Sequence, residues 1–381
     1  MVDSQMKTAD LIYEYTLKGA TWLARPAIVF YTLPFLMLLL VCGTVAQRYM
    51  GLYDAQKMFF SSFILWTGFV PLPGGYSLIA VISLCLLVKF LFFSQWKLKK
   101  AGINLTHLGI LVLLCGGLLT ALQAEEGYVV IPEKGRTTSI SDYHQRELLI
   151  LKNGIIHTRI PHQNIVSGMD FQFEGLPFAL KVRNHCRNCR IFKREEAQEN
   201  YGLPFLGMGK FMALEAQAPE KEDEANLYGA TLTITGAGEE FDGAYVIFEA
   251  MPKPITIEKE GIRYEIIYDK EQRSLPFTLE LVDFQKSVHP GTETPSHYHS
   301  DIMVEDNSIR WPVRIEMNKP LRYKGYTLFQ SSFARNRDET VTILSAVKNK
   351  GWLFPYIGVA IITIGLFLHV ILMSTGRRQR P

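Results

Sequence analysis

Four long apolar segments separate the polar parts of the chain. Each is close to the length of about 20 residues that an α-helix needs to cross the hydrocarbon core of a bilayer. They lie at residues 28–46, 76–94, 103–122 and 353–373. The sequence from 123 to 351 contains no comparable segment. The pattern predicts an integral membrane protein with four transmembrane helices and one large domain outside the membrane.

A fifth apolar segment, residues 58–70, is shorter and is followed by the turn residues of PLPGG. Because it is too short to span the membrane easily, we expect a helix that lies in the outer interface. The first long segment ends at Thr44-Val45-Ala46, which fits a signal cleavage site, but its full membrane length favours a retained anchor. The predicted parts are a cytoplasmic arm at 1–27, three membrane helices within 28–122, an outer domain at 123–351, a fourth helix at 352–374 and a tail at 375–381.

Basic residues indicate the orientation, because cytoplasmic segments of membrane proteins carry an excess of Lys and Arg. The loop after the second helix and the C-terminal tail fall on one side if the chain has four spans. Their basic residues are Lys97, Lys99, Lys100, Arg377, Arg378 and Arg380. We therefore expect loop, arm and tail in the cytoplasm and the large domain on the outer side. The net charge of only +3 argues against nucleic acid as a partner.

Alternating polar and apolar residues recur in the outer segment, which is typical of half-buried β-strands. Two such runs, ELLILKNGIIHTRI and ITIEKEGIRYEIIYD, contain the turn dipeptides Asn153-Gly154 and Glu260-Gly261 and predict β-hairpins. The fold class we expect is a β-rich antiparallel sandwich or open barrel, with a charged surface loop at residues 215–226. The sequence has no Gly-rich phosphate loop and no Gly-x-Ser-x-Gly motif. We assign no catalytic residue.

Two of the nine histidines lie in predicted membrane helices. His107 is near the start of the third helix and His369 near the end of the fourth, so both are expected toward the cytoplasmic side. Ionisable side chains are costly in hydrocarbon and usually have a function. Two imidazoles at similar depth on different helices could ligate a haem iron from both sides. The alternative is that each histidine bonds interfacial water or a neighbouring helix.

Several segments resemble the ResB family, also called CcsB, of system II cytochrome c biogenesis. The most specific is VRIEMNKPLRYKGYTLFQSSFARN, residues 313–336, near the end of the outer domain. Weaker ones are GTVAQ at 43–47, HLGILVLLCGGLLTAL at 107–122 and PYIGVAIITIGLFLHVIL at 355–372. The resemblance covers the whole predicted topology of three helices, an outer domain and a last helix.

The resemblance implies a function in haem delivery. ResB-like proteins pair with a CcsA-type membrane partner that carries a tryptophan-rich motif. Together they move haem to the outer face and attach it by thioether bonds to apocytochrome c. In the family a histidine of the third helix ligates haem, and His107 matches it, while the opposing ligand belongs to the partner.

The five tryptophans of this chain are scattered, so it looks like the half without the attachment site. The resemblance therefore implies a haem-handling, non-catalytic subunit of a holocytochrome c synthase (lyase) complex, which binds haem b transiently. Its location would be a bacterial cytoplasmic (inner) membrane, with the large domain facing the periplasm or cell exterior.

Two further groups could carry chemistry in the outer domain. Cys186 and Cys189 form a Cys-x-x-Cys motif, for which an oxidising compartment favours a disulfide. The alternatives are half of a metal site, or a thiol pair that reduces or docks apocytochrome c. His289, His297 and His299 could form a loop metal site, although a solvated polar loop is the simpler interpretation.

The segment from Asn318 to Phe333 alternates as a strand pair around Lys324-Gly325. Arg322 and Lys324 are expected on one strand face, where they could meet haem propionates or an acidic partner; an ordinary hairpin is the simpler interpretation. Two rival functions also remain. One is a cytochrome b-type electron-transfer subunit with a haem held by both membrane histidines. The other is a membrane-anchored binding module without haem.

Overall fold

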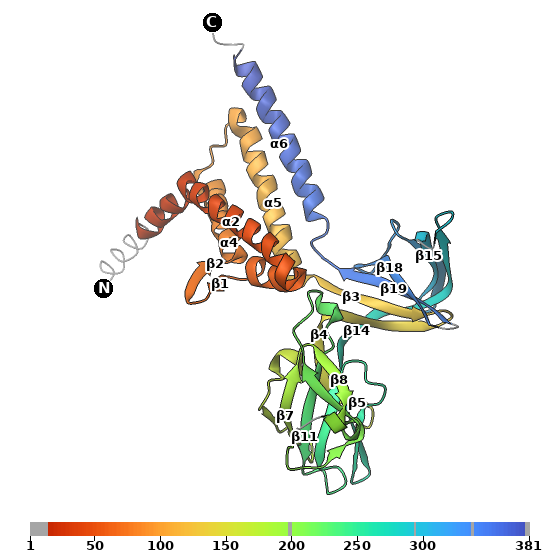
Figure 1. The fold of residues 1–381 in the computed structure, drawn as a ribbon. Helices are drawn as coiled ribbons and strands as arrows, with labels where there is room; N and C mark the ends of the chain where they lie inside the picture. The colour runs from red at the N-terminus through yellow and green to blue at the C-terminus, as the bar shows by residue number, and fades with distance from the viewer. Residues whose placement is uncertain (1–13, 197–199, 293–294, 337–338, 378–381) are drawn as a thin grey trace, which may run out of the picture. The chain divides into compact units, whose positions relative to one another are not determined.

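The computed structural model describes residues 14–196, 200–292, 295–336 and 339–377. The chain divides into two compact units (Figure 1), which we call the membrane unit and the outer unit. The membrane unit contains residues 1–125 and 348–381, and the outer unit contains residues 126–347. Of the predicted cytoplasmic segments, residues 1–13 and 378–381 lie outside the described residues.

Among its described residues, the membrane unit contains four helices that are long and apolar enough to cross a membrane, as predicted. They are α2 (Pro26–Met50), α4 (Gly75–Phe93), α5 (Ala101–Gln123) and α6 (Phe354–Arg377). Pro26 occupies the first turn of α2, where its missing N–H has no intrahelical partner to lose. Shorter helical pieces are α3 (Leu52–Ala55), a π-helix (Gln56–Phe60) and a 3-10 helix (Leu98–Lys100).

The prediction of an interfacial helix at residues 58–70 is wrong. After the π-helix the chain forms a two-stranded hairpin of β1 (Ile64–Thr67) and β2 (Val70–Pro73). The reason lies in the local sequence, since β-branched and aromatic residues favour strands. Gly68, with a φ of 68°, supplies the left-handed backbone that the turn requires. The hairpin nevertheless exposes Trp66 and Phe69, so the segment still presents an apolar surface.

The outer unit is built from β-strands. They are β3 (Glu125–Pro132), β4 (Arg136–Lys152), β5 (Ile155–Pro161), β6 (Asp170–Phe171), β7 (Ala179–Cys186), β8 (Cys189–Lys193), β9 (Phe205–Leu206), β10 (Met212–Ala216), β11 (Gly229–Thr235), β12 (Gly243–Phe248), β13 (Ile255–Lys259), β14 (Ile262–Val288), β15 (Pro295–Asp306), β16 (Ile309–Glu316), β17 (Leu321–Tyr323), β18 (Tyr326–Asn336) and β19 (Glu339–Lys348).

Two large sheets organise these strands. The ten-stranded sheet runs β16-β15-β14-β4-β3-β19-β18-β17, with β13 and β5 paired to β14 and β4. The five-stranded sheet runs β6-β7-β11-β12-β9, and β8 and β10 form a small sheet of their own. Nearly all pairings are antiparallel, the exception among the described pairs being β9 with β12. Among the described strands no closed barrel forms, which confirms the predicted class of an antiparallel, sandwich-like or open β-domain.

The long strands β4 and β14 pair with each other and take part in two separate hydrophobic cores. One core packs the five-stranded sheet, through residues such as Leu232, against Ile150 and Ile266. The other lies inside the curled half of the ten-stranded sheet and includes Leu279 and Leu328. The outer unit is therefore two β-layers joined by shared strands.

Three hairpin turns use the same backbone chemistry. Asn153-Gly154, Glu260-Gly261 and Lys324-Gly325 all have positive φ at both positions, between 47° and 82°. This is the requirement of a type I′ turn, whose twist matches that of the flanking strands. The three dipeptides join β4 to β5, β13 to β14 and β17 to β18, as predicted.

Candidate functional site

The membrane unit contains the two histidines that the sequence singled out. His107 lies in α5 and His369 in α6, two helices that pack side by side in the membrane unit (Figure 1). Both side chains are partly buried within this chain. The question is whether the helices bring the two rings to the same place.

Small residues form the contact between α5 and α6. A β-carbon at Gly102 would lie 2.4 Å from the backbone nitrogen of His369, and one at Gly109 would lie 2.6 Å from Ile362. On α6, Gly358 faces α5 in the same way. Glycines at such positions let two helix backbones approach closely in a membrane. His369 is therefore held level with Gly102, in the first turn of α5.

His107 lies on a different side of α5. It follows Gly102 by five residues, which corresponds to about 7.5 Å along the helix axis and a rotation of about 140°. The backbone of His369 packs at Gly102, whereas His107 lies about 140° around α5 from Gly102. The α5–α6 contact therefore does not itself place His107 opposite His369.

A buried polar contact orders the α4–α5 connection beside His107. The side-chain amide of Asn104, which is 8% exposed, donates a hydrogen bond of 3.0 Å to the carbonyl oxygen of Gln95. A buried amide needs such a partner. The bond ties the loop after α4 to α5 one turn before His107, and so helps to fix which face of α5 meets α4.

The cysteines of the outer unit form a disulfide. Cys186 ends β7 and Cys189 begins β8, and their sulfur atoms are bonded. Both residues are only 4% exposed and pack in an apolar cluster with Leu214, Val246 and Phe248. A disulfide enclosed by apolar side chains is poorly accessible to an incoming thiolate. We therefore interpret the pair as a structural staple between two strands.

The predicted histidine cluster lies mainly in strands rather than in a loop. His297 and His299 follow each other on one face of β15, with ring centroids 5.8 Å apart, and His299 is opposite Glu316 of β16. His289 lies in the exposed turn before β15. Within the part of the chain that the structure describes, no group of three or more His, Cys, Asp or Glu is arranged to hold a metal ion.

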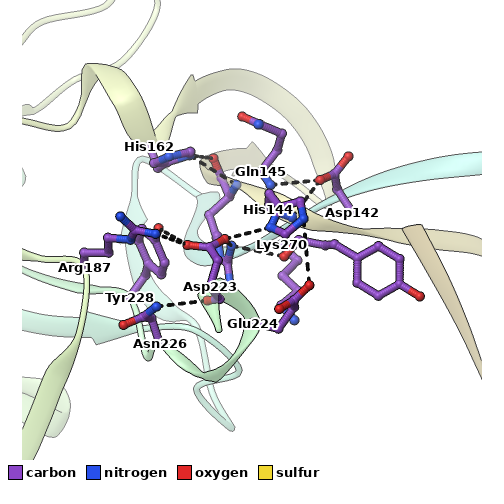
Figure 2. A network of polar contacts seen from close by, with 12 residues as sticks. Asp142, His144, Gln145, His162, Arg187, Asp223, Glu224, Asn226, Tyr228 and Lys270 are labelled. Atoms are coloured by element: carbon purple, nitrogen blue, oxygen red, sulfur yellow. Dashed lines mark hydrogen bonds and ion pairs between the residues drawn. The ribbon is translucent and has the colours of Figure 1, made fainter. Parts of the chain in front are cut away.

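The most extensive polar cluster of the outer unit centres on Asp223 (Figure 2). Its carboxylate is 1% exposed and accepts hydrogen bonds from Arg146 at 2.9 Å, Arg187 at 2.6 Å and the hydroxyl of Tyr228 at 3.1 Å. Nδ1 of His144 lies 2.9 Å from the same carboxylate. Strands, loops and a 3-10 helix (Asp223–Ala225) thus converge on one buried acid.

Arg146 is the second buried charge of this cluster. Its side chain is fully buried, its Nε donates to Glu249 at 3.1 Å, and its guanidinium lies over the Tyr228 ring. Burial by itself raises the pKa of Asp223. Hydrogen bonds from His144 and Arg187, together with the charge of Arg146, nevertheless hold that pKa well below the usual range of an aspartate. Because these charges satisfy one another, we interpret the cluster as a structural junction.

The sequence did not reveal this junction. The charged, turn-rich sequence of residues 215–226 predicts a surface loop, but Asp223 and Asn226 are buried. They are buried because the loop carries the carboxylate that neutralises Arg146, a residue far away in sequence on β4. A lone aspartate in a turn-rich acidic segment gives no signal of such a distant partner.

The segment 313–336 that resembles ResB proteins forms part of β16, β17 and β18. Lys324 occupies the turn rather than a strand face, and its Nζ lies 2.5 Å from the carboxylate of Asp306. Gln330 is 5% exposed and is bonded to Ser300 at 2.6 Å and to Thr342 at 2.9 Å. A turn, an ion pair and a buried polar contact across three strands account for these residues structurally.

Comparison with known proteins supports the resemblance of this segment to ResB proteins. Residues 255–352, from the start of β13 to just before α6, match the model of the ResB-like family. The chain is also 31% identical over 118 residues to Protein NrfI of Wolinella succinogenes. That similarity covers 30% of this chain and 13% of NrfI. The family match confirms the resemblance to ResB proteins.

Proposed function

We propose that this chain acts in cytochrome c biogenesis as the haem-handling subunit of a system II synthase, because residues 255–352 match the ResB-like family. The family match carries the proposal, because it covers most of the ten-stranded sheet together with the hairpin of β17 and β18. Haem b is the cargo in this proposal. The chain takes it up within the membrane and helps to bring it to the outer side for thioether attachment to apocytochrome c.

The surroundings of His107 fit a haem ligand. A neutral imidazole is a common axial ligand of haem iron, and His107 lies within the apolar helix α5. His369 lies on another side of α5, so it does not oppose His107 across the helix contact. This arrangement favours a second axial ligand from a membrane partner of the CcsA type over a clamp made by this chain alone.

The outer unit completes the proposal. The basic loop and tail favour an orientation in which this unit faces away from the cytoplasm. In the proposed role the membrane is a bacterial inner membrane and this unit faces the periplasm. There its β-rich surface would meet the partner and apocytochrome c. We assign no redox step to Cys186 and Cys189, because their disulfide is buried.

Visible spectroscopy tests the proposal directly. The chain is purified from membranes alone and together with a CcsA-type partner, as wild type, His107→Ala and His369→Ala. We expect a Soret band mainly in the complex, its loss in His107→Ala and its retention in His369→Ala.

The opposite results separate the rivals. If the chain purified alone carries haem, and both His107→Ala and His369→Ala lose it, the transport site is refuted and the haem is a permanent cytochrome b-type centre. Full haem occupancy in His107→Ala would refute the ligand assignment. If the wild-type complex shows no Soret band, a membrane-anchored binding module without haem is the remaining function.

A further inference from the structure

The hairpin of β1 and β2 packs one face against two membrane helices. Leu65 of β1 is 5% exposed and lies in one apolar cluster with Leu39 of α2 and Leu78 of α4. Leu39 precedes the end of α2 by about 16 Å along the helix axis. Just before the hairpin, Phe60 lies so close to Gly43 of α2 that a β-carbon on the glycine would be 2.4 Å from the phenyl ring. The hairpin therefore lies beside α2 and α4 (Figure 1) instead of extending beyond the end of α2.

The opposite face of the hairpin is apolar and exposed. Side chains alternate between the two faces of a strand, so Ile64 and Trp66 share the face that points away from the helices. Their exposed fractions are 53% and 58%, and Phe69 at the tip is fully exposed. Between Lys57 and Lys89 the sequence has no charged residue. An exposed apolar face that is free of charge marks a contact with lipid or with another protein.

The backbone of the hairpin suits contact with lipid near the membrane surface. The outer edge of a strand carries unpaired N–H and C=O groups, which are costly in hydrocarbon. Pro71 and Pro73 have no N–H, so β2 offers fewer unpaired donors. The carbonyl oxygen of Phe63, just before β1, accepts bonds from the N–H of Gly74 at 2.9 Å and from the hydroxyl of Ser77 at 2.7 Å. These features lower the cost of moving the hairpin out of water.

We propose that the hairpin inserts its exposed face into the outer leaflet of the bilayer, at the boundary between hydrocarbon and headgroups. Lipid is the favoured occupant because α2, beside which the hairpin packs, is itself a membrane span and exposes apolar side chains such as Val41 and Val45. At this boundary the Trp66 ring meets acyl chains while its N–H can reach headgroups or water. The open edge of β1 excludes the middle of the bilayer, where its backbone groups would lack hydrogen-bond partners.

Collisions of a nitroxide with two relaxants test this insertion. The label is attached to Phe69→Cys or, as a second exposed position, to Ile64→Cys, in a chain whose free cysteines Cys42, Cys85 and Cys115 are replaced by alanine. The labelled full-length chain is reconstituted in nanodiscs of phosphatidylethanolamine and phosphatidylglycerol, alone and with its CcsA-type partner. Oxygen accumulates in the bilayer, whereas a nickel chelate stays in water. We expect collisions with oxygen to exceed those with the nickel chelate severalfold at both positions and in both preparations.

The matched control is Phe211→Cys in the outer unit, where the native phenylalanine is 68% exposed. This label should collide more often with the nickel chelate than with oxygen. The same preference at both hairpin positions would overturn the proposal, because the hairpin would then face water. Protection from both relaxants after addition of the partner would also overturn it, because protein and not lipid would then cover the face. Neither result depends on haem at His107, so this proposal and the proposed function fail separately.

Discussion

Truncation of Asp223 to alanine tests whether the buried cluster is the structural junction of the outer unit. The substitution removes the carboxylate shared by Arg146, Arg187, His144 and Tyr228. Arg146, whose side chain is fully buried, then keeps Glu249 and the backbone carbonyls of Tyr143 and of residue 223 as hydrogen-bond partners. Removal of one partner from a buried ion pair costs about 3–5 kcal/mol when the remaining charge is left uncompensated. Because Arg146 keeps Glu249, we expect the lower end of this range, about 3 kcal/mol.

That loss is large against the total of about 5–15 kcal/mol that stabilises a typical domain. For a unit of this size we expect Asp223→Ala to lower Tm by roughly 6–12 °C. The measurement is thermal unfolding of the full-length protein in detergent, with amide hydrogen exchange to assign the transition to the outer unit. Protection of amides from exchange should fall first in β4, which carries Arg146, and in β12, which directly precedes Glu249.

Asp170→Ala is the matched control. Asp170 also forms an ion pair, with Lys181 at 3.0 Å, but its side chain is 67% exposed. An exposed pair of this kind contributes about 0–1 kcal/mol. If Asp223→Ala and Asp170→Ala lowered Tm equally and by less than about 2 °C, the reasoning about the buried junction would be refuted.

The pH dependence of the effect has a defined sign. The pKa of Asp223 is depressed in the folded protein, so its contribution is fully present above the unfolded value of about 3.9. The contribution is lost only as the pH falls below that value through the folded pKa. The difference in Tm between wild type and Asp223→Ala should therefore be constant near neutral pH and shrink in strong acid.

Three further predictions concern other parts of the molecule. Burial lowers the pKa of His185 to about 4 in the folded protein. As the pH falls from about 6.5 toward 4, the unfolded chain therefore binds more protons than the folded one, and stability decreases. His185→Gln should flatten the profile of Tm against pH in this window, and an unchanged slope would contradict this cause. Gly109→Ala places a methyl group against Ile362 and should destabilise the α5–α6 pair, whereas Gly117→Ala enters open space and should not; equal thermal unfolding of the two variants would argue against the observed contact. Replacement of Cys186 and Cys189 together by serine should cost about 2 kcal/mol and leave cytochrome c maturation intact, and a folded variant that fails in maturation would restore a redox role.

Part of the functional site could be predicted from the sequence. The helices that carry His107 and His369 follow from apolar length, and a histidine within such a segment is conspicuous because of its desolvation cost. The side of the helix on which each ring lies depends on which residues form the helix contact. Glycines occur at many positions of these helices, so the sequence alone did not indicate that His369 packs at Gly102 while His107 lies on another side of α5.

Local sequence patterns specify the elements whose causes are local. Apolar runs of membrane length specify α2, α4, α5 and α6. Alternating strands joined by Asn-Gly, Glu-Gly and Lys-Gly turns specify antiparallel hairpins, because few residue pairs tolerate positive φ at neighbouring positions. Tertiary structure alone decided the features that join distant residues. Asp223 is buried because Arg146 needs its charge, and Gln330 is buried because Ser300 and Thr342 meet it from other strands. Such contacts depend on how the sheets stack, and no local pattern of residues encodes that arrangement.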